Sequence, residues 1–137
     1  MARGAARGKA RRGSTLVESA VVATAFLLLL TAIMEFGRLG LAYDEVSFAA
    51  QSAARYAAVR GSGSGHPAAA ADIQAAAESY TAALDNTQVK VTVTWTPNNN
   101  PGSTVQVKVS YNFATALVPL SASGLTVQTT ARDIITQ

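Results

Sequence analysis

Cysteine is absent from this chain of 137 residues, and histidine and tryptophan each occur once. Without cysteine the chain can form no disulfide, no thiolate zinc site and no thiol nucleophile. Charged residues are also scarce, at 14% of the sequence, against about 25% in an ordinary soluble domain. Apolar residues make up 49%. This imbalance indicates a membrane segment, an alanine-rich chain, or both.

Acidic residues are missing from the first 13 positions, which hold five basic side chains: Arg3, Arg7, Lys9, Arg11 and Arg12. The remainder of the chain has six basic residues against eight acids, so the net charge of +3 comes from this tail. Basic tails beside a membrane segment stay on the cytoplasmic side. The charge therefore predicts a topology, and no nucleic-acid partner is expected.

The longest apolar run follows the tail. No charged residue occurs from Val21 to Met34, and counting from Leu16 gives 19 residues. About 20 residues are needed to cross a hydrocarbon core. The count places Glu18 inside or at the edge of the span, where a carboxylate is costly and is by default a functional candidate. A carboxylate held in the headgroup region by the positive helix N-terminus is the alternative interpretation of Glu18.

Four residues come directly after the apolar run: Glu35, Phe36, Gly37 and Arg38. A cleaved secretory signal peptide would place small residues in a small-x-small site here, so that interpretation fits poorly. Glu35 and Arg38 are three positions apart on a predicted helix, which allows a local ion pair. Contact with a partner subunit or with lipid headgroups at the membrane exit is the other interpretation of these four residues.

The residues around the start of the apolar run resemble a known processing site. A basic leader ends in Gly13, Ser14 follows, and Glu18 stands at the fifth position after Gly13. This arrangement resembles the processing site of type IV prepilins. Within that group the chain resembles TadE-like minor pseudopilins of the tight-adherence (Flp) pilus system. The resemblance is carried by residues 17–20 (VESA), 35–38 (EFGR) and 53–57 (AARYA).

The resemblance implies that a prepilin peptidase cuts between Gly13 and Ser14. It also implies that Glu18 accepts the new α-amino group of an adjacent subunit and sets its axial register. Ser14 and Glu18 are four residues apart, so they share one helix face. The implied partners are membrane lipid, the peptidase, other pilin-like subunits and pilus assembly proteins. The alternative is an uncleaved bitopic protein whose outer domain binds an envelope partner.

The helical pattern continues beyond the apolar run to about residue 60. Leu41, Phe48, Ser52, Arg55 and Val59 recur at helical spacing, with pairs of alanines between them. The alanines suit a close-packed helix face, but alanine is also the commonest helix former, and both interpretations stay open. The expected organisation is a basic cytoplasmic leader at 1–13, a transmembrane helix at 14–36, a protruding helix extension at 37–60, a flexible linker at 61–66 and an outer domain at 67–137.

The outer domain is predicted to be α+β. An alanine-rich stretch from Pro67 to about Leu84 predicts a second helix. Valines then alternate with polar residues at 89–95 and 105–113, which predicts a β-hairpin, and a third strand is expected within 125–135. Three antiparallel strands can bury one apolar face against a helix. Trp95 and the valines are therefore predicted to lie in the core.

Catalytic chemistry is not expected. The single histidine, His66, stands in a Gly-Ser loop before a proline, and no Cys/His cluster suits a metal. The sequence therefore predicts a protein without enzyme activity, metal, cofactor or small-molecule substrate. It is expected in the cytoplasmic (inner) membrane as a single-pass protein with its C-terminal domain outside, and possible incorporation into an extracellular pilus follows from the resemblance alone.

Overall fold

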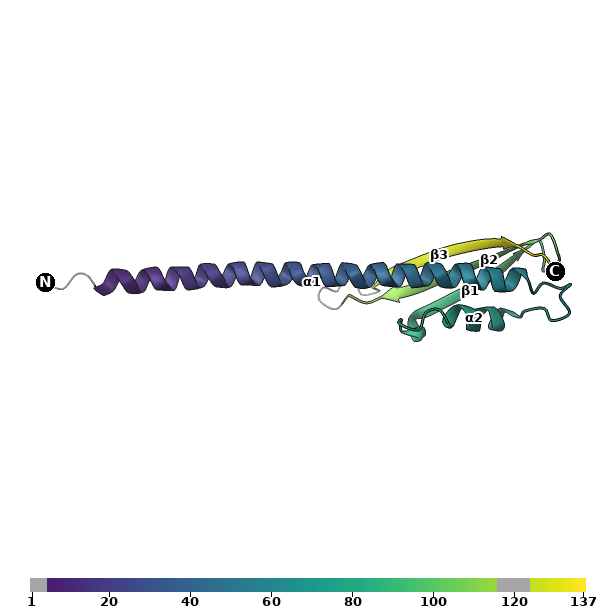
Figure 1. Ribbon diagram of the computed structural model, residues 1–137, viewed down its shortest axis with the longest axis horizontal. Helices are drawn as coiled ribbons and strands as arrows, with labels where there is room; N and C mark the ends of the chain where they lie inside the picture. The colour runs from purple at the N-terminus through teal and green to yellow at the C-terminus, as the bar shows by residue number, and fades with distance from the viewer. Residues whose placement is uncertain (1–4, 116–123) are drawn as a thin grey trace. The chain divides into compact units, whose positions relative to one another are not determined.

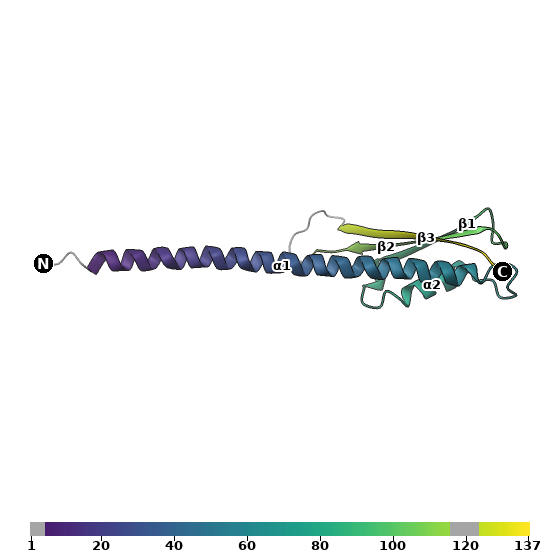
Figure 2. The same ribbon diagram turned by 45° about the horizontal axis from the view of Figure 1, so that its top comes forward.

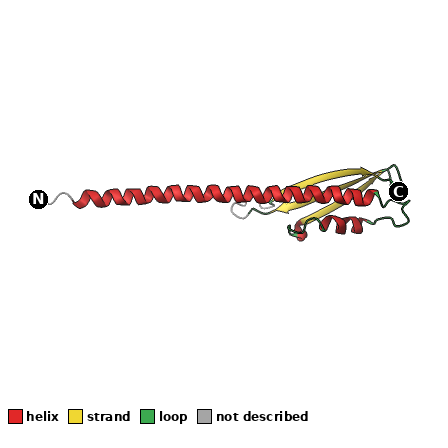
Figure 3. Ribbon diagram, in the orientation of Figure 1, coloured by secondary structure: helices red, strands yellow, loops and turns green. Residues whose placement is uncertain are grey.

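A computed structural model describes residues 5–115 and 124–137, with side chains described from residue 13 onward (Figure 1). Its elements in chain order are α1 (Ala5–Ala58), α2 (Ala70–Glu78), a 3₁₀ turn η1 (Asn86–Gln88), β1 (Val89–Thr96), β2 (Thr104–Phe113) and β3 (Leu125–Ile134). The predicted α+β class, with a long N-terminal helix, a second helix and three antiparallel strands, is confirmed (Figure 3). The chain divides into two compact units, Met1–Gly37 and Arg38–Gln137.

The first unit consists of the N-terminal part of α1. The large apolar side chains from Leu16 to Phe36 are exposed in it, and Phe36 keeps 73% of its surface. Among the described residues this is the one helix long and apolar enough to cross a membrane. The hydroxyls of Thr24 and Thr31 donate to the carbonyls of Ala20 and Leu27, at 2.8 Å and 2.7 Å. Both threonines therefore satisfy their polar group within the helix, as a hydrocarbon environment requires.

The second unit is built on a sheet of order β1-β2-β3, antiparallel throughout. Because side chains alternate between the faces of a strand, the valines of β1 and β2 share one face. In the register, Val93 pairs with Val107, which pairs with Ala131 of β3. Val107 and its neighbours Val105 and Val109 are fully buried. The predicted alternation therefore places these residues in the core, while the valines of β1 and Trp95 are half-buried at its margin.

The second half of α1 and helix α2 cover this apolar face (Figure 2). The α1 residues in the core are almost all alanines: Ala42, Val46, Ala49, Ala50, Ala53, Ala54, Ala57 and Ala58. Ile73 and Ala77 of α2 join the same core. Small side chains let the α1 backbone approach the sheet closely, because the valines of β2 already fill the space between them. The alanine ladder is thus the buried face of α1 in this fold.

The larger apolar residues of the same helix face outward. Leu41, Phe48 and Val59 keep 53%, 57% and 50% of their surface. A helix whose small residues are buried and whose large residues are exposed inverts the usual pattern. The helical spacing predicted from sequence is therefore present, but its large residues do not build the core of this chain.

The opposite face of the sheet is polar. This face carries one basic side chain on each strand: Lys90, Lys108 and Arg132. The three residues lie on successive rows of this face in the strand register. The Nε of Arg132 donates to Oε1 of Gln106 at 2.8 Å across β2 and β3. None of the described acidic residues alternates onto this face, so the sheet carries three positive charges there.

Helix α2 is shorter than the 67–84 expected from sequence. It begins at Ala70, where Asp72 accepts a hydrogen bond from the backbone N–H of Ala69 at 2.9 Å. It ends at Glu78, and the hydroxyl of Thr81 then bonds the Glu78 carbonyl and the Asn86 side chain. Thr81 is fully buried, so these bonds hold the chain in a turn where the alanine-rich composition alone would continue the helix.

Backbone hydrogen bonds close the end of the domain where α1 finishes. The N–H of Thr136 donates to the Ala58 carbonyl at 2.9 Å, and the N–H of Ser62 donates to the Asn99 carbonyl at 2.8 Å. Gly61 lies buried among these segments. A Cβ at this position would collide with the carbonyl oxygen of Gln137 and with Cγ2 of Ile135. Glycine is therefore required here by space and not by an unusual backbone angle.

Candidate processing and assembly site

Gly13 and Ser14 both lie within α1 and are exposed. The helix begins at Ala5, about ten residues before the start expected from sequence, because alanine, arginine and lysine are good helix formers. Gly13 costs a helix about 1 kcal/mol relative to alanine. A Cβ at Gly13 would meet nothing within 4 Å. No packing requirement of the described chain therefore explains why this position holds glycine.

Glu18 is exposed on the same helix, surrounded by the apolar side chains of Leu16, Val17 and Val21. It makes no hydrogen bond or ion pair with any residue that the structure describes. Its i−4 neighbour is Ser14, so both side chains lie on one helix face. An unpaired carboxylate in an apolar segment is costly in lipid, and pairing with a cation lowers that cost. In the uncut chain Ser14 has no free amine to serve as that cation.

The four residues after the apolar run differ in their surroundings. Phe36 and Gly37 are exposed, and Glu35 is half-buried. The guanidinium of Arg38 lies 5.3 Å from the ring centroid of Phe113, within cation–π range. Phe113 is buried at the end of β2, so this contact anchors Arg38 to the sheet of its own unit. A Glu35–Arg38 ion pair and a partner contact stay predictions.

No group of three or more His, Asp and Glu side chains suited to a metal occurs among residues 13–115 and 124–137. His66 is exposed, as expected, and its backbone N–H donates to the Ser64 hydroxyl at 3.3 Å.

The described chain thus combines one exposed apolar helix with a small α+β domain. Residues 13–55 match the family model of TadE-like proteins. The match begins at Gly13 and includes Glu18 and residues 35–38, so the resemblance predicted from sequence is confirmed over this segment. No curated protein and no solved structure matches the chain.

Proposed function

We propose that this chain is a pilin-like structural or assembly subunit of a tight-adherence pilus, cut by a prepilin peptidase between Gly13 and Ser14. The observation that carries the proposal is the isolated glycine at the start of the TadE-like segment. Gly37 and Gly40 of α1 also have open space around them, but Gly13 alone stands where the basic leader meets the apolar segment. A glycine at that boundary is explained by the narrow requirement of a peptidase for the residue before the cut bond.

The proposed organisation follows the membrane segment. The basic leader at 1–13 lies in the cytoplasm because its five cations oppose translocation. The apolar helix at 14–36 crosses the cytoplasmic membrane, the helix extension at 37–60 projects from it, and the domain beyond the linker at 61–66 lies outside. Glu18 receives the α-amino group of Ser14 from a neighbouring subunit, which fixes the axial register between subunits.

The test is the chemical identity of the N-terminus. The full chain, purified through a C-terminal tag from a host with and without its prepilin peptidase, is analysed by intact mass. A chain that begins at Ser14 only when the peptidase is present supports the proposal. An uncut chain in the peptidase-positive host supports the bitopic alternative instead. A chain that begins beyond Met34 identifies an ordinary signal peptide and contradicts both.

Gly13→Val sharpens this test because the position has open space for the new side chain. Valine is no worse than glycine in a helix, so the variant keeps its fold and loses only the cut. Gly40→Val is the matched control, because Gly40 is also in α1 with nothing within 4 Å of an added Cβ. We expect Gly13→Val to accumulate uncut and Gly40→Val to be processed as the unchanged chain is.

A further inference from the structure

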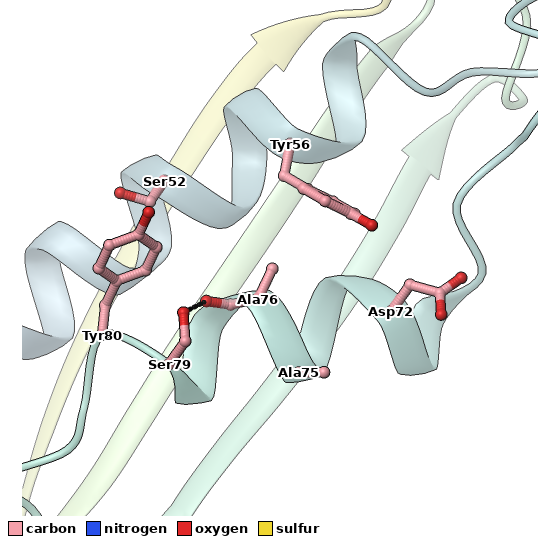
Figure 4. A pocket seen from close by; sticks show the side chains of 7 residues that line it. All are labelled: Ser52, Tyr56, Asp72, Ala75, Ala76, Ser79 and Tyr80. Carbon is pink, nitrogen blue, oxygen red and sulfur yellow. Dashed lines mark hydrogen bonds between the residues drawn. The ribbon is translucent and has the colours of Figure 1, made fainter.

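A groove runs between the second half of α1 and helix α2, on the side of the domain away from the sheet's polar face. The groove is open to solvent and has a volume of about 440 Å³, within the range of small-molecule sites. Helix α1 contributes Ser52 and Tyr56, α2 contributes Ala75 and Ala76, and Tyr80 lies in the turn just after α2 (Figure 4). The groove is hollow because alanines and a serine stand where larger side chains would close the gap between the helices.

Two tyrosines flank the groove, and each is held by a contact on its own side. The guanidinium of Arg60 lies 4.0 Å from the ring centroid of Tyr56. The ring of Tyr80 meets Phe48 edge to face, with 5.1 Å between centroids. These contacts restrict the orientations open to both rings before any ligand binds. Pre-oriented aromatic surface lowers the entropic cost of binding.

Polar groups without partners accompany the rings. The hydroxyls of Ser52, Tyr56 and Tyr80 make no hydrogen bond to any described residue. Asp72 at the end of the groove uses Oδ2 to accept from the Ala69 N–H, which leaves Oδ1 available. The Ser79 hydroxyl, by contrast, donates to the Ala76 carbonyl at 2.8 Å (Figure 4). Three hydroxyls and a carboxylate oxygen can therefore donate to and accept from a ligand.

Arg60 and Asp72 place one positive and one negative charge beside the groove, so the lining favours neither a cation nor an anion overall. Arg60 already occupies one face of Tyr56, which disfavours a second cation at that ring. A neutral molecule with an apolar face for the rings and several hydroxyls for the polar groups satisfies the whole set. A pyranose sugar has this form, since its C–H groups gather on the faces of the ring and its hydroxyls point outward.

We propose that the groove between α1 and α2 binds a neutral pyranose saccharide, with Tyr56 and Tyr80 against the sugar ring and Ser52 and Asp72 bonded to its hydroxyls. This goes beyond the pilin-like role and does not depend on it, because binding is measured on the protein without peptidase or filament. A free glycan and a sugar of an envelope polymer share the required chemistry.

The experiment is saturation-transfer NMR on the full chain in phospholipid nanodiscs, which avoids sugar-based detergents. The probes are the methyl β-pyranosides of glucose, galactose and N-acetylglucosamine, with choline and acetate as cationic and anionic probes. We expect transfer to the ring C–H protons of at least one pyranoside and none to choline or acetate. No transfer to any pyranoside, or stronger transfer to a charged probe, overturns the proposal.

Two pairs of variants locate the binding. Ala75→Leu fills the groove, whereas Ala70→Leu adds the same bulk at an exposed α2 position outside it. Tyr80→Phe removes one groove hydroxyl, and Tyr43→Phe removes an exposed hydroxyl elsewhere on α1. We expect Ala75→Leu to abolish transfer and Tyr80→Phe to weaken binding about 2–10-fold, as loss of one hydrogen bond predicts. The two controls bind as the unchanged chain does, and equal binding by all four variants overturns the proposal.

The source of the saccharide is decided by competition. If a free sugar is the ligand, an oligosaccharide of the binding pyranoside competes with it at equal or higher affinity. If an envelope polymer is the ligand, purified cell-wall fragments also displace the bound pyranoside. In the Ala75→Leu variant, neither the oligosaccharide nor the fragments change the pyranoside signal. Competition that persists at full strength in Ala75→Leu places the binding outside the groove and contradicts the proposal.

Discussion

At the scale of single residues, the space around a side chain can decide which residue type is allowed. Gly61 is the example with the sharpest steric consequence, because a methyl group there meets the Gln137 carbonyl and the Ile135 side chain. Its backbone angle is an ordinary one, so the requirement for glycine is spatial. Gly61 begins the segment 61–66, for which the sequence predicts a flexible linker. Ser62 and Ser64 form hydrogen bonds within this segment and to Asn99, and the flexibility of the linker stays a prediction.

Gly61→Ala is expected to destabilise the outer domain by about 1–3 kcal/mol, the usual cost of overpacking. Chemical unfolding of the full chain in nanodiscs, followed by Trp95 fluorescence, measures the change. Gly40→Ala is the control, because it adds the same methyl group in open space on a helix and should be neutral or slightly stabilising. Equal stability of the two variants would show that the space around Gly61 is not closed.

Glu18→Ala tests the assembly role at the same scale. Since Glu18 makes no hydrogen bond or ion pair with any described residue, its loss should leave the stability of the chain and its cleavage unchanged while reducing incorporation into filaments. The measurement combines intact mass for cleavage with quantification of subunits in sheared filaments. Filaments normal in number and subunit content in the Glu18→Ala strain would remove the register role from the proposal.

At the scale of elements, the alanine face of α1 decides how closely helix and sheet approach. Ala53 is fully buried against the sheet core. Ala53→Leu is expected to destabilise the domain by about 1–3 kcal/mol, because the valines of β2 leave no room for a branched side chain. Gln51→Leu, exposed on the same helix, is the control, and the comparison uses the same unfolding measurement. A stable Ala53→Leu variant would show that the helix can move away from the sheet without cost.

The 3₁₀ turn before β1 supplies a pH-dependent contribution. The hydroxyl and the backbone N–H of Thr87 both donate to Asp85, which lowers the pKa of this carboxyl below its ordinary value of 3.8. A group whose pKa falls on folding stabilises the native state above its unfolded pKa, and this contribution is lost as the pH falls through the folded pKa. The midpoint of thermal unfolding should therefore decline below about pH 3.8.

Asp85→Asn removes the pH-dependent contribution of this carboxylate to stability. Asparagine caps a helical turn about as well as aspartate, but its side chain does not titrate. Below the folded pKa of Asp85, we expect the variant and the unchanged chain to have the same midpoint of thermal unfolding. From neutral to acidic pH, the midpoint of the variant should fall less than that of the unchanged chain. Thermal unfolding measured from neutral to strongly acidic pH provides the comparison. Parallel profiles of the two proteins would mean that Asp85 contributes nothing to the acid dependence.

The elements differ in how far the sequence predicted them. Strict alternation placed β1 and β2 within a residue at each end, since a side-chain period of two is a direct consequence of the pleat. The third strand was expected within 125–135 without such a pattern, and β3 lies there. The length of α2 was overestimated because its end depends on Thr81 and Asn86, whose bond no local pattern reveals. The groove was missed altogether. Tyr56 on α1 and Tyr80 just after α2 lie 24 positions apart, and only the packing of α1 and α2 on one sheet brings them together.

For the whole molecule, the membrane interpretation rests on the apolar surface of the first unit. Leu27→Arg places a charge near the middle of the apolar segment, at a cost of about 2.5–3.5 kcal/mol on insertion scales. We expect this variant to be released by alkaline extraction of membranes to a larger extent than the unchanged chain. Leu16→Arg, at the end of the segment where the charge reaches the interface, is the control. Equal retention of all three proteins would contradict a single crossing by this helix.

The backbone bond between Thr136 and Ala58 has a mechanical consequence for such a subunit. Tension applied along α1 reaches the final turn of the helix, where this bond and the contact of the Thr136 hydroxyl with the same carbonyl, at 3.3 Å, pass it to the residues after β3. The load is then shared by the ladder between β3 and β2. A pull along α1 is therefore carried by the strand ladder as well as by the hydrogen bonds of the helix.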